Sequence, residues 1–494
     1  MAKKKYVREP MTSSAKGSSG GGAKSQPSPS SKATEQSKPG VESMWGSLFG
    51  GIKKIGGLEW LALAAVFVVF FTCFRWGLHL RAVDALAHTR LLAWFQQWQT
   101  DSDQLVLERL KQNHAGGIFS EALALGEKGS YGSQFGLASW LVALPATLFP
   151  SSVGIPLMFT LVAGFNAALV TVALRALART LSFGGAVLAA IALLQPWPTA
   201  MAHSIYWFMG IKILPAVVLA LLFAWGKDSL KQTYVAVSIF TALACLSGYE
   251  YITLVVALPL AVCTYYVVLR DYSWSDALRR LGVTLGASIT GFASALVVHL
   301  AQLSAHLHGV SAGLHLLLER VAVRTGSGTV VLASGTPADV QKLVADALAS
   351  NPKDVLGLYL SMPILGDPGD FGLLRLVNVA TLILVVIVAL VLGYRVIQRS
   401  ELESRHQAAG IAWLVALLGP VGWILLARPH SYIHSFINFD LWYVSVIPLG
   451  LALLWMPIRD GSKSLKVQKI PLSICAVVVL SVLIFFVYSG LTRR

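Results

Sequence analysis

The chain has 494 residues, of which 55% are hydrophobic and only 13% are charged, and its mean hydropathy is +0.66. Soluble globular proteins usually carry about 25% charged residues, so this composition excludes an ordinary soluble enzyme, a disordered chain and a disulfide-stapled secreted module. The formal net charge of +15 is expected for a membrane protein whose basic residues gather in its cytoplasmic loops. We therefore predict no nucleic-acid partner. The four cysteines lie in apolar runs without metal-ligand spacing, which is typical of small core residues.

The N-terminal residues 1–43 differ from the rest of the chain. They are rich in Ser, Gly, Lys and Pro, and they contain eight Lys or Arg residues against three Glu residues. Such a segment cannot bury enough apolar area to offset its chain entropy. We therefore predict a disordered basic cytoplasmic tail that contacts anionic lipid headgroups, followed by one membrane domain over 44–494.

Eleven apolar segments of about 17–25 residues follow, each long enough to cross roughly 30 Å of hydrocarbon. The predicted spans are 58–75, 153–174, 183–199, 209–226, 232–248, 251–269, 281–303, 373–394, 407–427, 440–457 and 470–490. These segments predict an all-α polytopic membrane protein with about eleven transmembrane helices. A shorter apolar segment, 136–149, is interpreted as an in-plane amphipathic helix, because counting it as a span would place the later basic loops outside.

Loop charge orients these spans. With a cytoplasmic N-terminus, the inner loops contain Arg175, Arg179, Lys227, Lys231, Arg270, Arg279, Arg280, Arg395, Arg399, Arg405, Arg459, Lys463, Lys466 and Lys469. The one Lys or Arg residue in the short outer loops is Arg428. This distribution follows the positive-inside rule and predicts that the N-terminus is cytoplasmic.

Two outer segments are long and cover 76–152 and 304–372. Apolar residues recur three and four positions apart in both, which is typical of amphipathic helices. We expect helices packed on the outer membrane surface rather than an independent β domain.

The first long outer segment carries Asp101 and Asp103 immediately before a helical pattern. Aspartates at this position can cap the helix. A carboxylate held at the membrane surface can instead act as a general base or as a metal ligand. The sequence leaves both interpretations open.

Three further titratable residues lie in or beside short outer loops. His203 belongs to the 200–208 loop, Lys212 lies just inside the next span, and Glu250 lies between two spans. A lysine in a membrane segment is costly, so Lys212 is either functional or reaches the nearby interface. Glu250 must be paired or hydrated, and Arg75 and Lys212 are candidate partners, with a catalytic role as the alternative.

The last short outer loop is densely polar. It carries Arg428, His430, Tyr432, His434, Asn438 and Asp440. His430 and His434 are four residues apart, so a helix would place both on one face. No third metal ligand is near, and an arginine with two histidines suits a phosphate oxyanion better than zinc. An ordinary interfacial aromatic belt is the alternative interpretation.

Four other histidines lead into the second long outer segment: His299, His306, His308 and His315. They pair at a spacing of seven, which also places each pair on one helix face. Polar rim residues are the favoured interpretation and a metal site is the minor one. A divalent metal is compatible with the chain but not required by it.

The order of these features resembles the GT-C class of integral-membrane glycosyltransferases, which includes lipid A aminoarabinose transferases and protein O-mannosyltransferases. A first span precedes a long outer loop that contains Asp101-Ser102-Asp103, a helix with Arg109, the Gly116-Gly117 turn and the run Tyr131-Gly132-Ser133-Gln134-Phe135-Gly136. Motif-level similarity is confined to 100–136, whereas the architecture matches over roughly 58–450.

This resemblance implies transfer of a sugar from a polyprenyl-phosphate carrier to a glycan, lipid or protein acceptor on the non-cytoplasmic face, in the bacterial inner membrane. It implies Asp101 as the base, with Asp103 second. The predicted substrate contacts are Lys212, His203, Glu250, Arg428, His430, His434 and Gln134. The chain departs from the class in having Asp-Ser-Asp for the common Asp-Glu pair and His203 where many relatives have an acid.

Two alternatives to this function remain open. One is a polysaccharide polymerase or ligase that uses diphosphate-linked donors. The other is a lipid-linked glycan transporter or flippase, for which span interiors made mostly of Leu, Val and Ala give little support.

Overall fold

The structure is a computed structural model. It describes residues 57–87, 91–97, 103–104, 107, 135–137, 141, 148–328, 337–362, 378–397 and 402–460, all within one compact unit, Gly56–Arg494. The elements in these ranges are α-helices, with no strand among them, so the predicted all-α class is confirmed. The basic tail at 1–43 and the last predicted span at 470–490 lie outside the described residues.

Five of the described helical segments are long and apolar enough to cross a membrane. They are α2 (Gly57–Trp76), α7 (Ser151–Thr180), α12 (Ile252–Leu269), α13 (Trp274–His306) and the consecutive helices α18 (Leu402–Ala416) and α19 (Leu418–Leu426). Shorter apolar helices are α10 (Met209–Ala224), α11 (Leu230–Leu246), α17 (Val379–Ile397) and α23 (Val446–Asp460). These helices are compatible with an integral membrane protein, whereas the number of eleven spans is not confirmed and stays a prediction.

A bend interrupts the predicted span 183–199. The helix axis bends by 72° between α8 (Phe183–Leu193) and α9 (Pro196–His203), and together these two helices form a sixth candidate span. Gln195 between them is extended, with φ of −65° and ψ of 158°. Pro196 causes this break, because proline has no backbone N–H and disfavours helical geometry in the residue before it.

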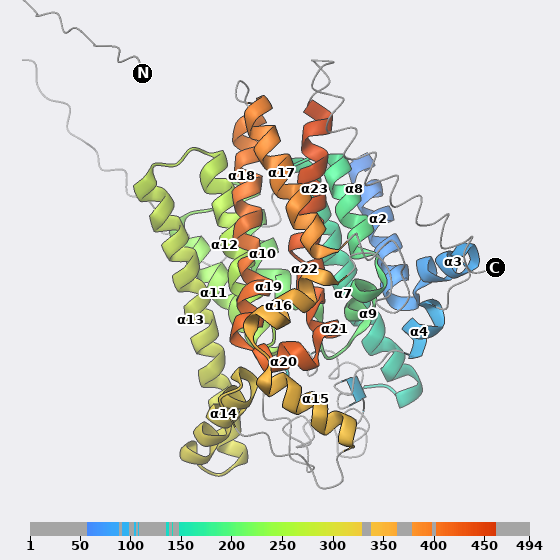
Figure 1. The fold of residues 1–494 in the computed structure, drawn as a ribbon, viewed down its shortest axis with the longest axis vertical. Coiled ribbons are helices and arrows are strands. Elements are labelled where there is room, and N and C mark those ends of the chain that lie inside the picture. Colours follow the sequence, from blue (N-terminus) through green and yellow to red (C-terminus); the bar gives the residue numbers. More distant parts are fainter. Residues whose placement is uncertain are drawn as a thin grey trace, which may run out of the picture. The chain divides into compact units, whose positions relative to one another are not determined.

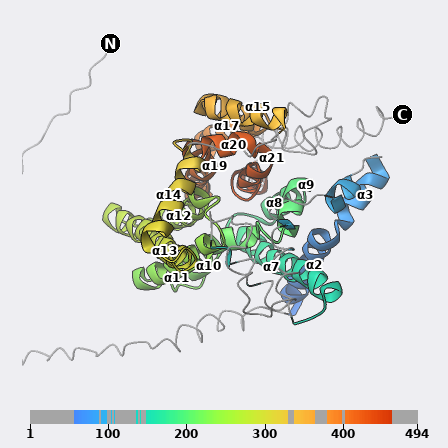
Figure 2. The same cartoon turned by 90° about the horizontal axis from the view of Figure 1, so that it is seen from below.

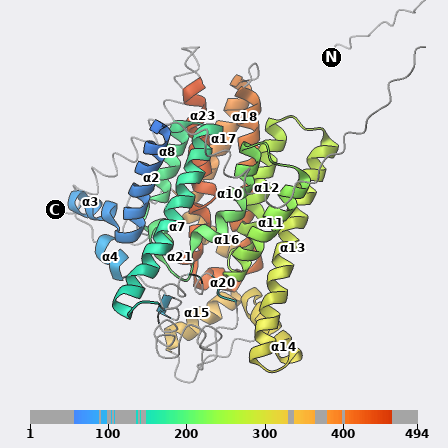
Figure 3. The same cartoon turned by 180° about the vertical axis from the view of Figure 1, so that it is seen from behind.

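Helix α12 lies inside the described bundle and packs against α10, α13, α18 and α19. Its sequence is apolar on every side, as expected for a helix surrounded by other helices. Helix α11 runs along α13, and both views from the side show this pairing (Figures 1 and 3). Figure 2 shows α2 and α7 together on one side of the bundle and α11 and α13 on the other.

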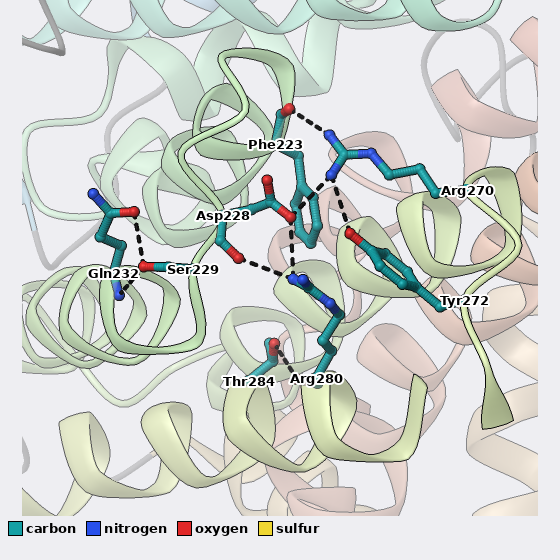
Figure 4. A network of polar contacts seen from close by, with 8 residues as sticks. All are labelled: Phe223, Asp228, Ser229, Gln232, Arg270, Tyr272, Arg280 and Thr284. Carbon is teal, nitrogen blue, oxygen red and sulfur yellow. Dashed lines mark hydrogen bonds and ion pairs between the residues drawn. The ribbon is translucent and has the colours of Figure 1, made fainter. Parts of the chain in front are cut away.

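A polar network ties one end of α10–α13 together (Figure 4). Oδ2 of Asp228 lies 2.9 Å from a guanidinium nitrogen of Arg270 and 3.0 Å from one of Arg280. Asp228 stands between α10 and α11, Arg270 follows α12, and Arg280 lies in the first turns of α13. The Tyr272 hydroxyl, two residues further along the chain, accepts another hydrogen bond from the Arg270 guanidinium at 3.3 Å. The network is a structural clamp between these helices, and the predicted orientation places it at the cytoplasmic end.

The second long outer segment is helical where the structure describes it, as predicted. It contains α14 (Val310–Thr325), α15 (Ala338–Ala349) and α16 (Pro352–Ser361). Helix α14 folds back against α13, and α14, α15 and α16 all pack against the short helix α20 (Arg428–Ile433). This arrangement brings the second long segment to the last short outer loop.

The first long outer segment is helical where it is described. Helices α3 (Leu78–Ala87) and α4 (Leu91–Gln97) pack against each other. Most of the predicted in-plane helix at 136–149 lies outside the described residues.

Candidate functional site

A buried ion pair lies at the N-terminal end of α12. A guanidinium nitrogen of Arg324, from the last turn of α14, is 2.5 Å from Oε1 of Glu250, and the two side chains are 16% and 2% exposed. Of the two candidate partners for Glu250, Arg75 instead donates to Oγ1 of Thr160 at 3.2 Å. The observed partner is therefore a residue of the second long outer segment.

Lys212 is enclosed in the same region. Its side chain is buried, and Nζ donates to the carbonyl oxygens of Gly248 at 2.6 Å and Ala244 at 3.1 Å. These carbonyls lie at the end of α11, where a helix has unpaired acceptors and a partial negative charge. Glu250 and Arg324 are both within electrostatic reach of the ammonium. Lys212 is thus held inside the protein by specific partners.

His430 and His434 lie side by side next to this ion pair. Their ring centroids are 4.6 Å apart, which confirms the prediction from their spacing. Burial, together with His434 and Arg324, holds the pKa of His430 well below its usual range. The His430 imidazole is therefore neutral at pH 7, so it can offer an N–H group to a substrate but no positive charge.

Arg428 lies at the start of α20. A guanidinium nitrogen donates to the carbonyl oxygen of Leu348 at 3.2 Å. Gly326 ends α14 with φ of 77°, and a Cβ there would lie 2.7 Å from Cγ of Pro429. Only glycine suits this left-handed turn and close approach, which brings the end of α14 against α20.

An apolar groove of about 570 Å³ lies beside the ion pair and is lined by α12, α13, α14 and α19. Helix α14 contributes Leu317, Arg320, Val321 and Arg324, whose spacing places them on one face. Nε of Arg320 is buried and has no hydrogen-bond partner among the described residues. We call this space the arginine groove. It combines apolar walls with two guanidinium groups, and only Arg324 forms a salt bridge within the described chain.

Positive charge exceeds negative charge at the end of the arginine groove next to the Glu250–Arg324 ion pair, which we call the head of the groove. Glu250 pairs with Arg324 and lies within electrostatic reach of Lys212. Arg320 lies one turn before Arg324 in the groove lining, and Arg428 lies beside Gly326 at the end of α14. Unpaired charge that is removed from water is costly, and a bound anion lowers this cost through charge-assisted hydrogen bonds. The region is electrostatically suited to an anionic group.

Two helices near this region begin at residues with left-handed backbone geometry. Phe208 precedes α10 with φ of 38°, and Tyr251 precedes α12 with φ of 69°. Such geometry costs a non-glycine residue roughly 1–3 kcal/mol and persists only where surrounding contacts fix it. The Tyr251 hydroxyl donates to the carbonyl of Ile437 at 2.9 Å, and its ring stacks on Trp207 with centroids 5.4 Å apart. These contacts hold the turn that carries Glu250.

Asp103 is a buried clamp on the 204–208 segment. Its side chain is 2% exposed, and Oδ1 accepts hydrogen bonds from Oγ of Ser204 at 2.8 Å and from the backbone N–H of Tyr206 at 2.9 Å. The next residue, Trp207, contacts Tyr251 as described above. Asp103 therefore joins the first outer segment to the region around Glu250.

His203 packs in a different direction. Its Nδ1 lies 2.9 Å from the carbonyl oxygen of Phe74, and its ring stacks on Phe159 with centroids 4.6 Å apart. Phe95 contacts the same ring at 5.0 Å. These contacts belong to the end of α2, to α7 and to α4 of the first outer segment, and they do not join His203 to the arginine groove.

Asp101 and Gln134 lie outside the described residues, so their predicted roles stay predictions. Sequence reasoning missed Arg320 and Arg324, although their spacing of four beside Leu317 and Val321 was visible as one mixed helix face. In the ranges that the structure describes, no group of three or more His, Cys, Asp and Glu side chains is placed to hold a metal ion.

Comparison with protein-family models, with curated proteins and with solved structures finds no match to this chain.

Proposed function

We propose that this chain is an integral-membrane glycosyltransferase that moves a sugar from a polyprenyl-phosphate carrier to an acceptor at the extracytoplasmic face. The proposal includes about eleven spans, a cytoplasmic N-terminus and a location in the bacterial inner membrane. The observation that supports it most is the arginine groove, with its apolar walls and its two arginines on one face of α14.

The groove matches the two parts of such a donor. A polyprenyl chain is long and apolar, and it gains free energy wherever it covers apolar side chains. Its phosphate needs donors, and a guanidinium offers two parallel N–H bonds to phosphate oxygens. Glu250 fixes the orientation of Arg324, while Arg320 has the unsatisfied Nε.

The chemistry needs few groups from the protein. The bond between the anomeric carbon and the phosphate oxygen breaks, and the phosphate leaves with the electron pair. The acceptor hydroxyl oxygen forms the new bond to that carbon, and its proton passes to a base, for which Asp101 is the proposed residue. Arg320 and Arg324 stabilise the charge that develops on the departing phosphate.

One observation favours a second candidate, a lipid-linked glycan transporter. Helices α8 and α9 form a bent pair of the kind that transporters use near their substrate sites. In that account the arginine groove would bind the same phosphate and the chain would move it without breaking a bond.

A binding and turnover experiment tests the proposal. The purified protein in proteoliposomes is given farnesyl phosphate to measure binding and a prenyl-phosphate-linked sugar with candidate acceptors to measure product. Arg320→Gln and the double variant Glu250→Gln/Arg324→Gln should each lower binding and product at least about tenfold, since each removes one charged contact.

The control is Arg279→Gln, an exposed arginine near the other end of α13, which should leave binding unchanged. Full phosphate binding by both groove variants would overturn the proposed site. Phosphate-dependent translocation without any glycan product would favour the transporter, and preference for a prenyl diphosphate would favour the polymerase or ligase.

A further inference from the structure

A second apolar space lies on the other side of α12. It is a cavity of about 230 Å³, lined mainly by α7, α10, α12, α18 and α23. Its lining on α10 extends from Met209 to Leu221, which is roughly 18 Å at 1.5 Å per residue. We call it the carboxyl cavity, because Asp440 supplies the one carboxyl group of its described lining.

Helix α12 separates the two spaces with opposite faces. The groove is lined by Ile252, Thr253, Val256, Ala257 and Leu260, and the cavity by Leu258, Ala261, Val262, Tyr265 and Tyr266. At 3.6 residues per turn these two sets are centred about 180° apart on the helix. The two spaces are therefore distinct sites and not two parts of one channel.

Asp440 has no hydrogen-bond partner among the described residues. Its side chain is fully buried, and neither carboxyl oxygen is bonded to a described residue. Asn166, another polar residue of the lining, is satisfied, because it donates to the carbonyl of Ala202 and accepts from the N–H of Gly210, both at 2.7 Å. A buried polar group without a partner is costly, so the cavity is built for a ligand that supplies one.

The chemistry of that ligand follows from the lining. Walls this apolar suit an alkyl chain, and the length of the cavity along α10 suits one chain rather than a branched or bulky group. A cationic head group would require a buried ion pair, whose desolvation offsets much of its attraction. A hydroxyl group satisfies a carboxyl group without burying charge.

We propose that the carboxyl cavity is a second lipid site, which takes a single alkyl chain ending in a hydroxyl group that hydrogen-bonds Asp440. Tyr251 lies within electrostatic reach of both Asp440 and Glu250, so the head ends of the two sites are neighbours. That such a lipid is also the sugar acceptor rests on the proposed function. Binding in the cavity does not.

Photolabelling tests this site. The full chain in lipid nanodiscs is irradiated with 1-hexadecanol that carries a diazirine in mid-chain, and labelled residues are mapped by mass spectrometry. Label is expected on α10 and α23, and unlabelled 1-hexadecanol should compete about tenfold better than hexadecane or hexadecanoate, the ratio that one buried hydrogen bond supplies.

Matched variants on one helix provide the control. Val262→Phe fills the cavity and should abolish this labelling, whereas Val256→Phe fills the groove and should leave it intact. Asp440→Leu should reduce competition by 1-hexadecanol to the level of hexadecane. Equal competition by hexadecane, or no effect of Val262→Phe, would overturn the proposal, and stronger competition by hexadecylamine would contradict the neutral head group.

Because the labelling requires no sugar transfer, its failure is separate from failure of the transferase proposal. Cavity labelling with no glycosyltransferase activity would leave the second lipid site standing alone. Activity without cavity labelling would remove the second site and retain the first.

Discussion

The arginine groove and the carboxyl cavity share one wall, helix α12, yet they differ in the polar groups at their ends. The groove has Arg320 and Arg324 from α14, and Glu250 holds the second of these in an ion pair. The cavity has one carboxyl, Asp440, with no described partner. An apolar helix can thus divide two lipid-sized spaces whose selectivity comes from residues on other elements. The contrast predicts an anionic head group on one side of α12 and a hydroxyl on the other.

The largest expected change in stability comes from breaking the Glu250–Arg324 ion pair beside the arginine groove. Arg324→Gln leaves Glu250 buried without its charged partner, so the free energy of unfolding should fall by about 3–5 kcal/mol. The double variant Glu250→Gln/Arg324→Gln should recover much of that loss, because neither member of the ion pair is then left charged without the other. Thermal or denaturant unfolding in detergent measures both, and equal instability of single and double variants would contradict the pairing.

Asp103 tests whether the first outer segment acts as a clamp. Asp103→Ala removes the acceptor for Ser204 and Tyr206 and should lower the free energy of unfolding by about 1–3 kcal/mol. Asp103→Asn keeps an oxygen at the same position and should stay close to the unsubstituted protein in stability. If Asp103→Asn folds normally and loses all product, Asp103 is catalytic and the clamp is only part of its role.

Substitution of Asp440 in the carboxyl cavity is expected to raise stability, whereas the two substitutions above lower it. Asp440→Leu replaces an unpartnered buried carboxyl with an apolar side chain and should raise the free energy of unfolding by about 1–2 kcal/mol in the absence of ligand. Asp440→Asn keeps a polar group there and should change stability less. A lower unfolding temperature for Asp440→Leu would show that the carboxyl has a partner, and would weaken the second lipid site.

The smallest expected effect concerns a histidine outside both spaces. Burial lowers the pKa of His79 to about 4 from an ordinary value of 6.5, so the folded protein holds it neutral. Between these two values the unfolded chain binds the extra proton, and stability therefore falls as the pH is lowered from 6.5 towards 4. His79→Gln should make the unfolding temperature less dependent on pH in that window, while variants of Asp440 should leave this slope intact.

Local features of the fold were predictable from the sequence. Long apolar runs predicted α2, α7, α12 and α13, because hydrophobic length is itself the signal for such helices. A spacing of four placed His430 beside His434. Helical periodicity also predicted the helices in the described parts of the second long outer segment.

The partners within the candidate site were not predictable in the same way. Glu250 and Arg324 are 74 residues apart, and Asp103 and Ser204 are 101 residues apart, so only the packing of distant helices brings each pair together. The unpartnered state of Asp440 depends on every element around it. Sequence spacing predicts which residues share a helix face, and tertiary packing then selects what each face meets.

The central claim is that Arg320 and Arg324 hold a lipid phosphate at the head of the arginine groove. A cryo-electron microscopy structure of the full chain in nanodiscs with farnesyl phosphate tests it most directly. We expect density for the phosphate within hydrogen-bonding distance of both guanidinium groups, with the prenyl chain along Val256 and Leu260. Phosphate density elsewhere, or a prenyl chain in the carboxyl cavity beside Asp440, would contradict it.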